Sequence, residues 1–157
     1  MFSKKETDSE KEVELLSTLF DFLMEAIGDD MDATSYGEEE AKKSIVKKTK
    51  ALKALEGYDI DGYKPDVEKG VYRVSKGMST AIRNYLLAFM AEDKATLHGA
   101  ASPYQVELLI RDARKAEAEL KAFLPPFKVA VNEAEERYMK QHNGERPGED
   151  ASIRAKL

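Results

Sequence analysis

The side chains that most often carry chemistry are sparse in this chain of 157 residues. It contains two histidines, His98 and His142, and no cysteine, which excludes thiol catalysis, disulfides and cysteine-ligated metals. Neither histidine belongs to a recognisable Ser/His/Asp set, and there is no P-loop or other glycine-rich phosphate cradle. These residues favour a non-enzymatic protein that needs no cofactor.

Carboxylates are abundant, but their spacing does not match known helical metal enzymes. Di-iron bundle proteins use Glu-x-x-His pairs, and neither histidine has a glutamate three residues before it. All-α nucleotide pyrophosphohydrolases hold magnesium with acidic pairs, but Glu38 is followed three places on by Ala41. Both classes of enzyme are therefore disfavoured.

The segment 57–68 resembles an EF-hand calcium loop over twelve residues. Asp59 and Asp61 stand at the positions of the third and fifth ligands, and Glu68 at that of the bidentate carboxylate. The sequence departs from the family at Gly57, where the first aspartate ligand belongs. The resemblance implies a metal site made of Asp59, Asp61 and Glu68. The alternative is an ordinary turn before a helix opened by proline.

His98 stands at the end of a predicted helix, and Ser102-Pro103 opens the next one. This order resembles the proximal histidine and following helices of the globins. The resemblance implies haem ligation by His98. The alternative is a histidine placed where the dipole of a helix C-terminus favours it, and the same explanation serves for His142.

A basic face is predicted on the second helix. At helical spacing, five lysines fall opposite the apolar residues: Lys42, Lys43, Lys47, Lys50 and Lys53. Such a face suits phosphates, an anionic membrane surface or an acidic protein partner, and the alternative is a solvated surface. Lys48 falls on the apolar side instead.

Apolar residues at helical spacing predict an all-α protein, with helices over about 10–27, 38–55, 65–98 and 103–123. Capping boxes start the first at Ser9 and the fourth at Ser102. The third is apolar nearly all round, so we expect it at the centre. Within it, Gly70 and Gly77 mark either a bend or a close helix crossing. Short loops favour an antiparallel up-down bundle of these four helices.

A fifth helix is expected after Pro125-Pro126, because paired prolines stop or sharply kink a helix. Its apolar residues Phe127, Val131 and Tyr138 form a narrow seam. Such a seam suits contact with a protein partner. Together with the basic face, these three residues are the candidate partner-binding residues.

Composition limits the location and the partners. The net charge of −5 argues against nucleic-acid binding, because proteins that bind nucleic acids normally carry an excess of basic charge. No apolar stretch is long enough to span a bilayer and no signal peptide is recognisable, which favours a cytoplasmic protein. Residues 1–142 are expected to form one domain, followed by a flexible polar tail over 143–157.

The sequence as a whole favours a helical interaction or assembly module, an adaptor-like or inhibitor-like accessory protein that binds another protein or forms a homo-oligomer. The alternative is a sensor of a metal or small ligand, through the loop 57–68 or through haem at His98.

Overall fold

The computed structural model describes residues 7–28, 37–99 and 102–147. These residues form four α-helices, α1 (Ser9–Ile27), α2 (Glu38–Gly57), α3 (Lys69–His98) and α4 (Pro103–Gln141), and a short 3-10 helix, η1 (Asp61–Tyr63). No strand occurs in the described ranges, so the predicted all-α class is confirmed.

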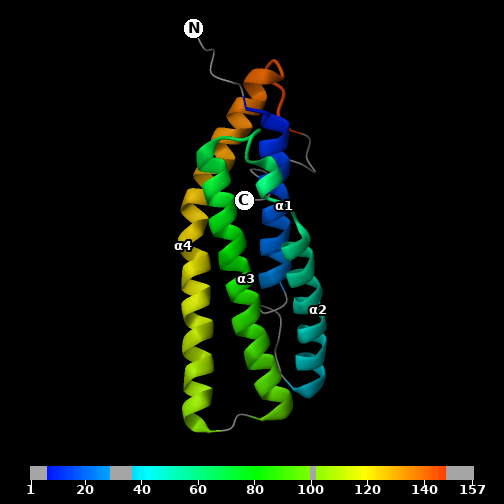
Figure 1. Ribbon diagram of the computed structural model, residues 1–157, viewed down its shortest axis with the longest axis vertical. Helices are drawn as coiled ribbons and strands as arrows, with labels where there is room; N and C mark the ends of the chain where they lie inside the picture. The colour runs from blue at the N-terminus through cyan, green and yellow to red at the C-terminus, as the bar shows by residue number, and fades with distance from the viewer. Residues whose placement is uncertain (1–6, 29–36, 100–101, 148–157) are drawn as a thin grey trace.

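Helix α3 lies at the centre of the fold, as its apolar sequence predicted. It packs against α1, α2 and α4, and Figure 1 shows it between α4 on one side and α1 with α2 on the other. Successive helices run in alternating directions (Figure 1). Because α1 is shorter than α3, it covers only one end of the bundle (Figure 1).

The core is built mainly from α1, α3 and the second half of α4. Leu15, Leu16 and Leu19 of α1 are completely buried, since this helix contacts α2, α3 and α4 at once. By contrast, α2 buries few large side chains. Burial of apolar surface is the main force that holds such a bundle together, so α2 is the helix with the weakest apolar attachment.

The starts of the helices agree with the capping signals in one case and differ by a few residues in others. Ser102 caps α4, its hydroxyl accepting a hydrogen bond from the Gln105 amide at 3.2 Å, as predicted. The cap of α1 is Asp8 rather than Ser9, because the Ser9 hydroxyl is used in a contact with α4. Helix α3 begins at Lys69, four residues after Pro65, which lies in a turn.

The predicted break at Pro125-Pro126 is wrong: α4 is one helix of 39 residues that runs through both prolines. The prolines remove the amide donors for the carbonyls of Lys121 and Ala122. All four residues are exposed, so water can satisfy those carbonyls. Beyond the prolines, α4 leans toward the start of α1 (Figure 1). Burial of the side chains that follow offsets the cost of the prolines, and the described residues after Pro126 form no separate fifth helix.

The two glycines of α3 have different surroundings. A Cβ atom at Gly77 would overlap the ring of Phe123 on α4, so this glycine permits a close crossing of α3 and α4. At Gly70, a Cβ atom would meet nothing within 4 Å. The sequence left open whether each glycine marks a bend or a close helix crossing. Of the two, only Gly77 lies at a close crossing.

Candidate functional site

The basic face of α2 is exposed along its length. Five side chains share this face: Lys42, Lys43, Lys47, Lys50 and Lys53. Val46 lies among them and is 54% exposed, with Lys42, Lys43 and Lys50 one turn away along the helix. The surface is thus an apolar side chain surrounded by cations, which we call the α2 lysine face.

Lys48 is excluded from this face by burial. Its ammonium lies 3.7 Å from the Asp93 carboxylate of α3, and both side chains are only 6% exposed. Ser44 joins the pair, its hydroxyl donating to Asp93 at 2.6 Å and accepting from Lys48 at 2.5 Å. A buried charge needs such partners, and this network ties α2 to α3. The position of Lys48 on the apolar side of the helix was the signal for it in the sequence.

The carboxylates of the segment 57–68 have separate roles. Asp59 accepts a hydrogen bond from the Gly62 amide at 3.1 Å, which is a local turn contact. Asp61 accepts from the Tyr72 hydroxyl at 2.6 Å and lies 3.1 Å from the Lys76 ammonium. These two donors hold the pKa of the Asp61 carboxyl below its usual range. Glu68 is the residue before α3.

The described structure does not bring these carboxylates together as one group of metal ligands. In the described ranges, no group of three or more His, Asp or Glu side chains is placed to hold a metal ion. A pocket of about 370 Å³ lies between the end of α2 and α3, and its two cations are already paired. Lys76 pairs with Asp61, and Arg83 pairs with Glu56 at 3.3 Å. The segment therefore acts as a structured connection between helices.

His98 is the last residue of α3 and is exposed to solvent. A haem-ligating histidine works inside an apolar pocket that encloses the porphyrin. No such enclosure surrounds this side chain in the part of the chain that the structure describes. The globin-like order of helices is thus not accompanied by a globin-like pocket.

The apolar seam predicted for a partner belongs to the core instead. Phe127 is 1% exposed and Val131 is 0% exposed, because the second half of α4 packs across α3 and α1. Tyr138 is half-buried and its ring stacks on His142, with the centroids 3.8 Å apart. The assignment of Phe127 and Val131 to a partner surface was wrong, since it assumed a helix detached from the bundle.

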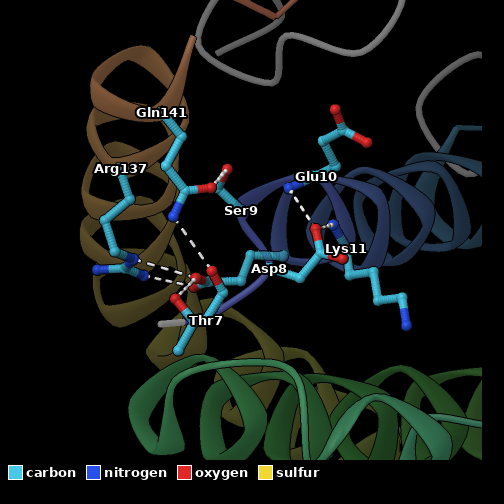
Figure 2. Close-up of polar contacts among 8 residues, drawn as sticks. Thr7, Asp8, Ser9, Glu10, Lys11, Arg137 and Gln141 are labelled. Carbon is cyan, nitrogen blue, oxygen red and sulfur yellow. Dashed lines mark hydrogen bonds and ion pairs between the residues drawn. The ribbon is translucent and has the colours of Figure 1, made fainter. Parts of the chain in front are cut away.

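A polar cluster joins the start of α1 to the end of α4 (Figure 2). Arg137 makes two hydrogen bonds to the fully buried carboxylate of Glu12, at 2.5 and 3.1 Å. Thr7 also donates to Glu12, at 2.7 Å, and the Gln141 amide donates to the Thr7 carbonyl. Ser9 donates to the Gln141 side chain at 2.5 Å.

The geometry of this cluster is that of a structural lock rather than a catalytic site. The Glu12 carboxylate accepts hydrogen bonds from the Arg137 guanidinium and the Thr7 hydroxyl, so it is not positioned to act as a general base on a substrate. The Ser9 hydroxyl donates to an amide oxygen, which does not activate it as a nucleophile. In the sequence, the one indication of this cluster is the position of a charged residue, Glu12, on the apolar side of α1.

Exposed apolar side chains also occur near the connection of α3 to α4. Leu87 of α3 is 40% exposed, and Tyr104, Val106 and Ile110 of α4 are 70%, 41% and 42% exposed. Single exposed apolar residues are ordinary on a protein surface. The connection of α3 to α4 lies at the end of the bundle that α1 does not cover (Figure 1).

Comparisons of the chain with protein families, with curated proteins and with solved structures found no match. No helix in the described ranges is both long and apolar enough to cross a membrane.

Proposed function

We propose that this protein is a cytoplasmic accessory protein that acts by binding the acidic surface of another protein through the α2 lysine face. The observation that carries the proposal is the segregation of charge. Five exposed lysines surround Val46 on one helix, although the chain as a whole has a net charge of −5. Catalysis has no part in the proposal.

Four of the five lysines of this face are available to a partner. Among the described residues, Lys42, Lys43, Lys50 and Lys53 form no salt bridge within the protein. Other cations on the surface, such as Lys11 and Lys76, are paired with aspartates. The four cations Lys42, Lys43, Lys50 and Lys53 are complementary to an acidic surface on another molecule.

Val46 gives the face a contact that does not depend on charge. Interfaces commonly combine an apolar centre with a charged rim, where the rim guides association and selects the partner. The buried side chains of α2 lie on the side that packs against α3, and Val46 lies on the exposed side. A protein partner therefore fits this face better than an isolated anion, because an isolated anion makes no apolar contact with Val46.

Site-specific crosslinking tests the proposal, with a photoreactive p-benzoylphenylalanine in place of Val46 in cells that naturally express the chain. Val129 on α4 provides the matched control, because it is also an exposed valine, at 55% against 54%. We expect a discrete protein adduct from position 46 that position 129 does not give. Tryptic sequencing then identifies the partner, and an adduct of twice the chain mass identifies a second copy.

The adduct also reports on the role of the lysines. We expect it to disappear when Lys42, Lys43 and Lys50 are changed to Glu. A crosslinked lipid or nucleic acid would contradict a protein partner. Identical adduct patterns from positions 46 and 129 would contradict the assignment of the face.

A further inference from the structure

His142 connects the end of α4 to α1 through both of its ring nitrogens. Nε2 lies 3.0 Å from a carboxylate oxygen of Glu10 on α1. Nδ1 lies 2.8 Å from the backbone carbonyl oxygen of Tyr138, one turn earlier on α4. The ring also stacks on that of Tyr138 at an interplanar angle of 9°.

Both neighbours of the imidazole are hydrogen-bond acceptors. A carboxylate and a carbonyl cannot donate, and a neutral imidazole carries only one N–H. The two contacts are therefore made together only by the doubly protonated imidazolium. Its positive charge also suits the C-terminal end of α4, where the helix dipole is negative.

The segment after His142 folds back toward α1. The Gly144 amide donates to the Met139 carbonyl at 2.7 Å, and the Glu145 amide donates to the His142 carbonyl at 3.0 Å. Pro147 is buried, and together with Val13, Ser17 and Tyr138 it lines a pocket of about 360 Å³ between α1 and α4. His142 thus stands at the start of the segment that reaches this pocket.

We propose that His142 is a pH-dependent latch, which holds residues 143–147 against α1 when protonated and releases them when neutral. Release would uncover Val13 and the ring of Tyr138, and so would change the surface at the joined ends of α1 and α4. This device is independent of the α2 lysine face.

The surrounding charges set the direction of the switch. Glu10 on α1 and Glu145 in the following segment face the imidazole, and the Tyr138 carbonyl accepts from it. The hydrogen bond to Glu10, then that to Tyr138, raises the pKa of His142 above its usual value of 6.5. The contact is therefore complete below that usual value, and it is lost as the pH rises through the raised pKa.

The test is an NMR titration of the full chain, which follows the His142 ring and the hydrogen-exchange protection of the Gly144 amide in the same pH series. The decisive variant is Glu10→Gln. Glu14→Gln is its matched control, since Glu14 is an exposed carboxylate one turn along α1 that lines the same pocket. The ring signal of His98 is assigned separately, so that the titration of His142 is not confused with it.

In the wild type and in Glu14→Gln, we expect the protection of Gly144 to fall several-fold over the pH range in which His142 loses its proton. In Glu10→Gln, both the ring titration and the loss of protection should move together to lower pH. Protection that ignores the ionisation of His142, or a ring titration unchanged by Glu10→Gln, would overturn the proposal. His142→Gln should keep the protection, at every pH, at the low level that the wild type reaches above the raised pKa, and full protection in that variant at low pH would also overturn the proposal.

Discussion

The guanidinium of Arg137 on α4 holds the carboxylate of Glu12 on α1 with two hydrogen bonds, across 125 residues of sequence. Glu12 is completely buried, whereas the Arg137 side chain is 25% exposed. The pair joins the first turn of α1 to the last turns of α4. It fixes how the two ends of the described chain meet.

Removal of Arg137 should be more costly than removal of both partners. Arg137→Met leaves a buried carboxylate without its counter-ion, which costs about 3–5 kcal/mol of unfolding free energy. In the double variant Glu12→Leu/Arg137→Met, most of this loss should be recovered, because no unpaired charge remains. Urea denaturation followed by circular dichroism measures both. A double variant as unstable as Arg137→Met would show that the pair is not the source of the effect.

The two glycines of α3 should respond in opposite directions to alanine. Gly70→Ala has free space and gains helix propensity, so it should stabilise the protein by about 0.5–1 kcal/mol. Gly77→Ala forces the ring of Phe123 to move, and such overpacking costs about 1–3 kcal/mol. Thermal unfolding of the two variants under the same conditions makes the comparison. Equal shifts in Tm would contradict the close crossing of α3 and α4.

The second half of α4 should behave as core. Phe127→Ala removes a side chain that is 1% exposed, with an expected loss of about 3–5 kcal/mol. Val129→Ala, two residues away and 55% exposed, should change stability by less than about 0.5 kcal/mol. Chemical denaturation measures the free energy of unfolding of the two variants. If Phe127→Ala altered the oligomeric state but not stability, the original assignment of this residue to a partner surface would be restored.

The helices could be predicted from sequence because their signals are local. Apolar spacing and caps such as Ser102 depend on residues within one or two turns. The continuity of α4 could not be predicted in the same way. It depends on the burial of Phe127 and Val131 against other helices, which outweighs the local preference of Pro125-Pro126 to end a helix.

The polar contacts were harder to predict than the helices. Lys48 and Glu12 both lie on the buried side of their helices. This position indicates a buried ion pair but does not identify the residue of opposite charge. The partners Asp93 and Arg137 become neighbours only through the packing of distant helices. The lysines of α2 needed no such information, since their common face follows from helix geometry alone.

The measurement that tests the central proposal most directly is the equilibrium binding of the crosslinked partner to three purified proteins at low and high salt. These are the wild type, a variant with Lys42, Lys43 and Lys50 changed to Glu, and a control with Arg114, Lys115 and Lys128 of α4 changed to Glu. Both variants carry the same change of net charge on exposed residues. We predict that the α2 variant raises Kd by roughly tenfold or more at low salt and much less at high salt. The control should bind like the wild type. Equal weakening by both variants, or no weakening by the α2 variant, would contradict the α2 lysine face as the binding surface.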